Sequence, residues 1–284
     1  GSYRNGQEDI PPKSGPDLHV TIDAELQAMA ESLFVNKQGA AVALDPKSGE
    51  ILSLLSSPDY DPSVLAGKVT GQIWNHLQQD PKDPLFNRAT MSQQPPGSTF
   101  KPFMALVGLE EGVITRNTEI YCPGYYTYRG HVFQCHGEPH GSVTVKEAIT
   151  ESCNTFFFTV MMRLNFQEWH DWGEMFGFGH RITTDLPKQA PGILPDSAYF
   201  DRTYGEGKWT RGYLVSLGIG QGNMGVTPLQ LTRYAGALAN GGTLHPPHMV
   251  RKIVDTQTGE VRQPELSAPQ TLPVDPGYMK TVRE

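Results

Sequence analysis

The stretch QQPPGSTFKPFMALVGLEEGV, residues 93–113, combines turn formers, a helix start and two reactive side chains. Proline fits poorly beyond the first turn of a helix, so Pro102 requires the helix to begin close to Ser98. Positions i and i+3 share one helix face, which places Ser98 and Lys101 side by side. We therefore expect a helix over residues 98–111 that projects a serine and a lysine into one cleft.

The segments around this helix predict a mixed fold. Phe103, Met104 and Val107 form an apolar face on the helix itself, and Gly112 ends it. Helical spacing recurs in the ranges 21–34, 145–164, 169–176 and 226–240. Turn residues between β-rich runs predict hairpins at 39–58 and 249–261, whereas 114–142 and much of 179–211 look like loops. Hairpins with long helices indicate the α/β class, α+β type: an antiparallel sheet flanked by helices.

The 284 residues fit one large domain, and composition excludes several kinds of partner. A net charge of −7 without basic clusters gives no footprint for nucleic acid or an anionic membrane. No apolar run approaches the ~20 residues of a spanning helix. Gly1-Ser2 resembles a cloning remnant, so a native anchor could have been removed. We interpret residues 1–16 as this remnant and a linker, and 17–284 as the domain.

A serine hydroxyl is a poor nucleophile at neutral pH and needs a neighbouring base. Lys101 could serve as that base for Ser98 only when neutral, and burial or a second cation would lower its pKa. Ser98 at a helix N-terminus would also lie near backbone N–H groups that stabilise an oxyanion. The alternative is an ordinary helix start, because about one Ser-x-x-Lys is expected by chance in such a chain.

A second element raises the weight of the catalytic interpretation. Ser152-Cys153-Asn154 contains the only Ser-x-Asn of the chain and falls where a loop meets a helix. Serine and asparagine also favour helix caps, so a polar helix start remains an alternative. In the functional interpretation Ser152 relays a proton between Lys101 and the leaving group, while Asn154 binds Lys101 and a substrate amide.

Together, Ser98-Thr99-Phe100-Lys101 and Ser152-Cys153-Asn154 resemble the first two motifs of the penicillin-binding proteins and serine β-lactamases. The stretches VTIDAELQ, AAVALDPKSGEILSLLSSPDYDP and LGIGQGNMGVTPLQLTRYAGALANGG resemble the transpeptidase domain of class B penicillin-binding proteins, particularly the elongation type called penicillin-binding protein 2. The similarity runs from about Pro16 to Val250. In it, Gly220-Gln221-Gly222 borders the cleft.

The resemblance implies a peptidoglycan D,D-transpeptidase. Ser98 would attack the penultimate D-Ala of a stem peptide, D-Ala would leave, and an amine from a second strand would resolve the acyl-enzyme; β-lactams would acylate the same serine. The resemblance implies no cofactor for this chemistry. It also implies a protein anchored in the cytoplasmic membrane, with this domain on the extracytoplasmic (periplasmic) side, beside a RodA-type glycan polymerase and MreC. Alternatives are a β-lactam sensor or non-catalytic peptidoglycan-binding domain, and a serine β-lactamase.

One departure from the family pattern concerns the third motif, Lys-Ser/Thr-Gly, which belongs on a strand after the Gly-Gln-Gly stretch. Lys280-Thr281-Val282 lacks the glycine, and the matches at 13–15 and 47–49 precede Ser98. We expect the chain to stop before that strand, so that the fold lacks its C-terminal strands here. By the same resemblance, the strand would supply a carboxylate contact, a cation near Lys101 and an oxyanion N–H.

The region between the two motifs concentrates soft-metal ligands. Three thiolates and one imidazole suit tetrahedral zinc, and a long loop usually needs such a staple. The preferred set is Cys122, Cys135, His140 and Cys153, with His136 as the substitute. The zinc would be structural, behind the catalytic loop, because Cys153 should point away from the cleft that Ser152 and Asn154 face. A disulfide between two cysteines or three buried thiols are the alternatives.

Overall fold

The computed structural model describes residues 14–66, 69–182 and 184–284. Most of the expected linker, residues 1–13, lies outside this part. The helices are α1 (Ala24–Leu33), α2 (Gly71–Gln79), α3 (Arg88–Met91), α4 (Lys101–Glu110), α5 (Val145–Thr150), α6 (Asn154–Arg163), α7 (Phe166–Met175), α8 (Ser197–Tyr204), α9 (Pro228–Asn240) and α10 (Pro276–Arg283), with 3₁₀ turns η2 (Pro62–Leu65), η3 (Gly97–Phe100) and η4 (Arg211–Ile219). The strands are β1 (Asp17–Val20), β2 (Gly39–Leu44), β3 (Ile51–Ser57), β4 (Ile120–Cys122), β5 (Tyr125–Tyr128), β6 (His131–Gln134), β7 (Gly141–Val143), β8 (Thr243–Leu244), β9 (Val250–Val254), β10 (Val261–Arg262) and β11 (Gln270–Thr271).

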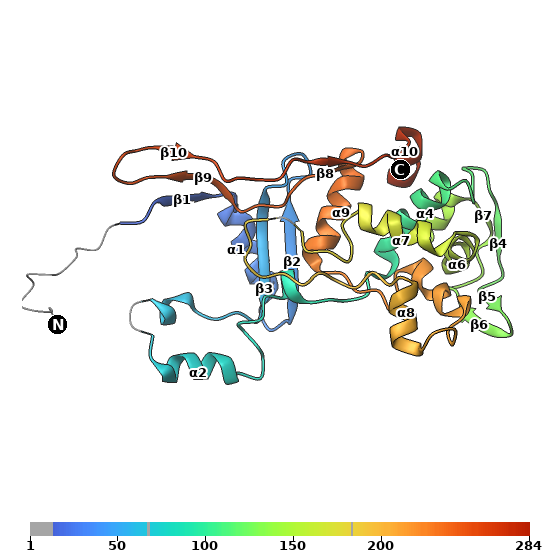
Figure 1. Ribbon diagram of the computed structural model, residues 1–284, viewed down its shortest axis with the longest axis horizontal. Helices are drawn as coiled ribbons and strands as arrows, with labels where there is room; N and C mark the ends of the chain where they lie inside the picture. The colour runs from blue at the N-terminus through green and yellow to red at the C-terminus, as the bar shows by residue number, and fades with distance from the viewer. Residues whose placement is uncertain (1–13, 67–68, 183) are drawn as a thin grey trace, which may run out of the picture.

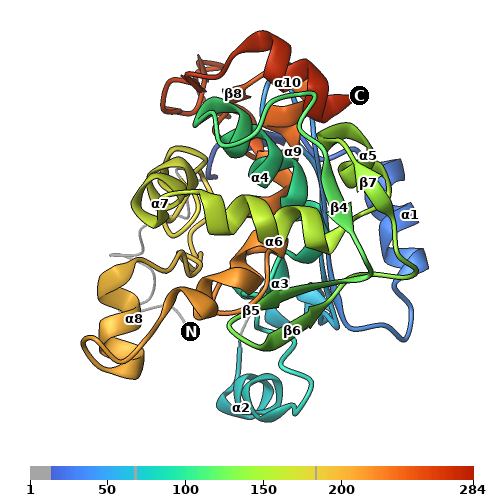
Figure 2. The same cartoon turned by 90° about the vertical axis from the view of Figure 1, so that its right-hand side faces the viewer.

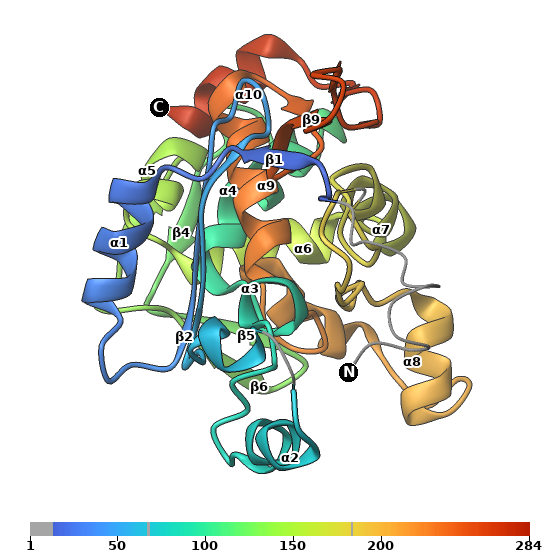
Figure 3. The same cartoon turned by 90° about the vertical axis from the view of Figure 1, so that its left-hand side faces the viewer.

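The hairpin of β2 and β3 forms as expected and separates two layers. It pairs Gly39 with Ser57 and Leu44 with Ile51, with α1 on one side and α9 on the other (Figure 3). Gln27 fixes α1 to the hairpin, because its side-chain amide donates to the Leu54 carbonyl and accepts from the Leu54 N–H and the Ser53 hydroxyl. The hairpin thus forms a platform between helices, as the α+β prediction requires.

The other described strands form small separate antiparallel ribbons, which corrects the expectation of a single sheet. β9 lies between β1 and β10, β8 pairs with β11, β4 with β7, and β5 with β6. Many of these strands have only two to four residues, too few to extend a common sheet. The β9–β10 hairpin extends to one end of the molecule, and the helical part lies at the other (Figure 1).

Helix α4 lies at the centre of the helical part (Figure 2). We expected Phe103, Met104 and Val107 to form one apolar face, but the seven residues 103–109 are all buried. Helices α5, α6 and α10 surround α4, and Trp169 of α7 contacts Met104, with its indole nitrogen 3.1 Å from the sulfur. A helix buried on all sides has no polar face, so the apolar residues do not follow one stripe.

Two expected loop regions contain regular structure. Residues 114–142 form the β4–β7 and β5–β6 ribbons, and Ser197–Tyr204 form α8 within the supposed irregular 179–211. The continuous helical pattern from residue 145 is interrupted after Thr150, where α5 ends before α6 starts at Asn154. The helix expected in 21–34 forms as α1, yet Met29 and Leu33 are more than half exposed. Among the described residues, no helix combines the length and apolar character needed to cross a bilayer.

Candidate active site

The turn that carries Ser98 is held by the Gly-Gln-Gly stretch. Ser98 lies exposed in η3, directly before α4. The Gly97 N–H donates to the Gly220 carbonyl over 2.9 Å. Gly220 has φ +63°, and a Cβ there would lie 2.6 Å from the Gly97 oxygen and 2.7 Å from Phe100 Cβ. Only glycine allows this approach, so the backbone of residue 220 fixes the turn beside the nucleophile.

Lys101 is the first residue of α4, and its amine reaches the Ser-x-Asn motif. The side chain is 1% exposed. Nζ donates to the Ser152 carbonyl and to Asn154 Oδ1, each over 2.6 Å, and lies 2.8 Å from Ser152 Oγ. Ser152 Oγ lies 3.1 Å from Ser98 Oγ. Within the described residues no hydrogen bond joins Ser98 to Lys101 directly, so Ser152 connects them.

Burial changes the acidity of this amine. Removal from water lowers the pKa of Lys101 from 10.5 to about 8, although the nearby Cys135 and Cys153 thiols act in the opposite direction. A fall of that size corresponds to about 3 kcal/mol of differential stabilisation of the neutral form. About a tenth of Lys101 is then neutral at pH 7, which is enough for it to act as a base.

Ser152 is aimed at Lys101 by an unusual backbone conformation. Its φ is +53°, in the left-handed region that serine rarely adopts. The break between α5 and α6 accommodates it, because the Ser152 N–H donates to the Ile149 carbonyl and the Cys153 N–H to the Ala148 carbonyl. The amide of Asn154 donates to the Gln134 carbonyl over 3.3 Å, so this motif is also tied to the end of β6.

The predicted ligands Cys122, Cys135, His140 and Cys153 come together behind that motif. The four ligand atoms lie within 4.8 Å of one another. His140 Nδ1 is 3.5 Å from Cys122 Sγ and 3.6 Å from Cys135 Sγ, and the Cys135 and Cys153 sulfurs are 3.8 Å apart. Tetrahedral zinc with Zn–S of about 2.3 Å and Zn–N of about 2.0–2.1 Å requires edges of roughly 3.8 Å for S–S and 3.6 Å for S–N. The residues therefore fit a zinc ion.

Other features of the cluster agree with this fit. The three thiols are free, and a disulfide would need sulfurs about 2.05 Å apart. Cys153 is fully buried. Burial would raise the pKa of Cys122, but hydrogen bonds with Thr155 and His140 hold it at about 6, whereas burial raises the pKa of Cys153. The exposed His136, the substitute ligand, is outside the cluster.

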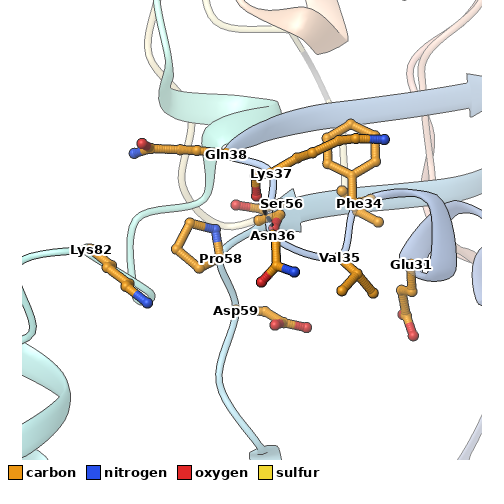
Figure 4. A pocket seen from close by; sticks show the side chains of 12 residues that line it. Glu31, Phe34, Val35, Asn36, Lys37, Gln38, Ser56, Pro58, Asp59 and Lys82 are labelled. Carbon is orange, nitrogen blue, oxygen red and sulfur yellow. Dashed lines mark hydrogen bonds between the residues drawn. The ribbon is translucent and has the colours of Figure 1, made fainter.

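Two cavities help to place the site. A cavity of about 440 Å³ borders it, lined by the 136–140 loop, Thr150, Glu151 and Ser152. Another, of about 580 Å³, lies at the end of the β2–β3 hairpin, where Lys37, Pro58 and Lys82 surround it (Figure 4). None of the predicted catalytic residues lines this second cavity, whereas Ser152 lines the first.

Two contacts of the site were not predicted. The ring of Phe157 lies 5.9 Å from Lys101 Nζ, and the hydroxyl of Tyr234 contacts the backbone on either side of Lys101. Helical spacing placed Tyr234 on an apolar face of α9, but no local pattern identifies a partner more than a hundred residues away.

Comparison with known proteins agrees with this geometry. Residues 39–284 match the family model for the penicillin-binding protein transpeptidase domain. The peptidoglycan D,D-transpeptidase MrdA of Escherichia coli K12 is 33% identical over 251 residues, covering 87% of this chain and 40% of that protein. The structure of Pseudomonas aeruginosa PBP2 in complex with WCK 5153 superimposes with a TM-score of 0.86 at 33% identity, covering 95% of this chain and 61% of that one. The complex of PBP2 and MreC from Helicobacter pylori gives 0.79 at 29% identity, with coverages of 94% and 47%.

The chain belongs to the penicillin-binding protein transpeptidase domain family. It spans less than half the length of the E. coli relative. Within the family it is of the class B, penicillin-binding protein 2 (MrdA) type, as the sequence resemblance predicted.

Proposed function

We propose that this domain, in its full-length protein, is a peptidoglycan D,D-transpeptidase that cross-links stem peptides through a serine acyl-enzyme during cell elongation. The observation that carries the proposal is the continuous line of contacts from Ser98 Oγ through Ser152 Oγ to Lys101 Nζ, at 3.1 and 2.8 Å. These distances are within the reach of direct proton transfer between the three groups.

In the proposed acylation, neutral Lys101 keeps two N–H bonds, to the Ser152 carbonyl and Asn154 Oδ1, and turns its lone pair to Ser152 Oγ. Ser98 Oγ attacks the carbonyl of the penultimate D-Ala while its proton passes to Ser152 and the Ser152 proton to Lys101. Collapse of the tetrahedral intermediate breaks the peptide bond. The proton passes from Lys101 through Ser152 to the amine of the departing D-Ala. Lys101 is then neutral again.

An amine of a second stem peptide then attacks the ester carbonyl and gives its proton to Lys101. The proton returns through Ser152 to the Ser98 oxygen as the ester C–O bond breaks. A β-lactam would acylate Ser98 by the same steps, but its amine stays attached to the opened ring and blocks the acceptor. A serine β-lactamase would add an activated water and clear the ester rapidly. A sensor or binding domain would stop at the acyl-enzyme or at non-covalent binding of peptidoglycan.

A fluorescent penicillin tests this proposal on the full-length protein. We expect stoichiometric labelling of the wild type, no labelling of Ser98→Ala, and an acyl-enzyme that persists. A second assay follows the transfer of an unlabelled stem peptide to an amine acceptor. A transpeptidase forms the cross-linked product, and a sensor does not. Absence of covalent label on the folded wild type contradicts the assignment of Ser98, and fast antibiotic turnover favours the β-lactamase.

We also propose a structural zinc ion held by Cys122, Cys135, His140 and Cys153. All four positions around the ion are filled by protein, so it would leave no place for a reacting water. The Asn154 N–H donates to Cys135 Sγ over 3.2 Å, a contact that would orient a thiolate ligand and tie it to the catalytic motif. Metal analysis of protein purified without a histidine tag tests this; less than about 0.2 zinc per chain contradicts it.

The relatives also suggest a cellular location and partner proteins. We propose an extracytoplasmic, periplasmic domain of a protein anchored in the cytoplasmic membrane, acting with MreC and a RodA-type glycan polymerase. The named complex of a Helicobacter pylori relative with MreC supports the first partner. Co-purification of the full-length protein with each partner tests this placement.

A further inference from the structure

The hydroxyl of Tyr234 occupies a position inside the helix that carries the nucleophile. It accepts the N–H of Phe103 over 3.0 Å and donates to the carbonyl of Thr99 over 3.2 Å. In a continuous α-helix these two groups, four residues apart, would bond each other. The phenol therefore bridges a pair that the regular helix would close.

This bridge lies where the backbone changes its helical type. Residues 97–100 form the 3₁₀ turn η3, and α4 begins at Lys101, with Pro102 as its second residue. Pro102 has no N–H, so this junction already lacks one backbone donor. A side chain that inserts into the hydrogen-bond ladder bends a helix at that point. The bridged pair lies where the η3 turn, which carries Ser98, passes into the body of α4.

Tyr234 is held in place by the packing around it. It is 2% exposed, and its ring packs against Phe176 and Phe178, with centroids 5.8 and 5.6 Å away. Its own helix, α9, packs on β2, so the platform of the fold supports the hydroxyl. A hydroxyl that both donates and accepts must be neutral, and complete burial favours that form by raising the pKa of Tyr234.

We infer that Tyr234 is a positioning residue for the nucleophile: its hydroxyl holds the turn–helix junction open and thereby sets the Ser98–Ser152–Lys101 spacing. It does not touch a reacting atom. The inference rests on the proposed acyl-transfer function. Without the hydroxyl, Phe103 and Thr99 are free to close on each other, which would draw the Ser98 turn away from Ser152.

The test compares Tyr234→Phe with Tyr278→Phe in the full-length protein. Tyr278 lies in α10, is only partly buried and stacks on Arg116 away from the site, so its variant controls for the loss of any hydroxyl. Acylation by a fluorescent penicillin is resolved into the rate at saturation and the half-saturating concentration. We expect Tyr234→Phe to lower the saturating rate by about tenfold or more, since small misplacements of reacting groups are costly. The half-saturating concentration, the labelled fraction and the apparent pKa of the rate should stay close to the wild type.

Three results are distinguishable. A Tyr234→Phe rate equal to that of Tyr278→Phe overturns the inference, and so does a smaller labelled fraction with an unchanged rate in the remainder, which indicates only a loss of stability. Failure of the wild type to label overturns the proposed function itself. Amide exchange gives a reading independent of labelling: the Phe103 amide should change its exchange rate in Tyr234→Phe, and an unchanged amide contradicts the bridge.

Discussion

Replacement of Gly220 by alanine should disturb the nucleophile turn in a way that the structure quantifies. A Cβ at residue 220 would stand 2.6 Å from the Gly97 oxygen and 2.7 Å from Phe100 Cβ, distances that real Cβ contacts do not show. Gly222 offers a matched control. It too has a positive φ, +81°, but its Cβ would meet only Ser216 and Leu217, at 3.6 and 3.7 Å.

The two variants share one cost and differ in another. An alanine in the left-handed region costs about 1–2 kcal/mol, which both variants incur. Overpacking against atoms that must move adds about 1–3 kcal/mol, which only Gly220→Ala incurs. The extra cost of about 2 kcal/mol corresponds to a further fall of roughly 4–8 °C in melting temperature for a domain near this size. Because the displaced atoms belong to Gly97 and Phe100, which flank Ser98, acylation should slow by up to about a hundredfold in Gly220→Ala alone.

Thermal unfolding and fluorescent penicillin labelling of the wild type and both variants measure these effects. Gly220→Ala should melt below Gly222→Ala and label more slowly, while Gly222→Ala labels at close to the wild-type rate. Equal melting temperatures and equal labelling rates in the two variants would refute the argument that the Gly220 backbone supports the turn.

Three further predictions concern the relay and the cluster. The acylation rate should rise about tenfold per pH unit up to about 8 and level above it, because only neutral Lys101 accepts a proton; a flat rate from about pH 6 to 9 contradicts this. Ser152→Ala should slow acylation by about 10²–10⁴ with little change in melting temperature, whereas the neighbouring Thr150→Ala should match the wild type. Cys135→Ala should reduce bound zinc to below about 0.2 per chain and lower the melting temperature; His136→Ala should retain the metal, and equal zinc in both variants would exclude Cys135 as a ligand.

Much of the site could be predicted because its strongest signals are local. Pro102 alone restricts where the helix starts, and the spacing of three then places Ser98 beside Lys101. For the Ser-x-Asn motif the residues suggested a proton relay, and the family resemblance made that interpretation specific, since serine and asparagine also favour helix caps. The cysteine cluster was predicted from ligand chemistry, and the fold brings together the preferred four residues.

The missed features depend on contacts that sequence patterns do not contain. The Tyr234 hydroxyl meets a backbone group 131 residues away, and helical spacing identifies only the apolar face of such a residue. The strands at 120–143 are three or four residues long, and their many turn residues concealed them. Helix α4 had no single apolar stripe, because neighbours on every side bury it. Tertiary packing decided each of these outcomes.

The proton relay explains why so many separate elements converge on one turn. Its three groups lie 2.8 and 3.1 Å apart, and hydrogen bonds weaken steeply once the heavy atoms separate beyond about 3.2–3.5 Å. A displacement of a few tenths of an ångström would therefore interrupt the transfer. Ser98 is exposed and lies on a 3₁₀ turn, whose hydrogen bonds are too weak to keep the Ser98 hydroxyl in place to that precision. Gly220 restrains the turn from one side and Tyr234 from within the helix, while Cys135 of the cysteine cluster accepts the N–H of Asn154 in the Ser-x-Asn motif. Loss of any one restraint should therefore slow acylation more than it weakens ligand binding. Binding depends on the surface of the cleft, whereas proton transfer depends on the distances between Ser98, Ser152 and Lys101.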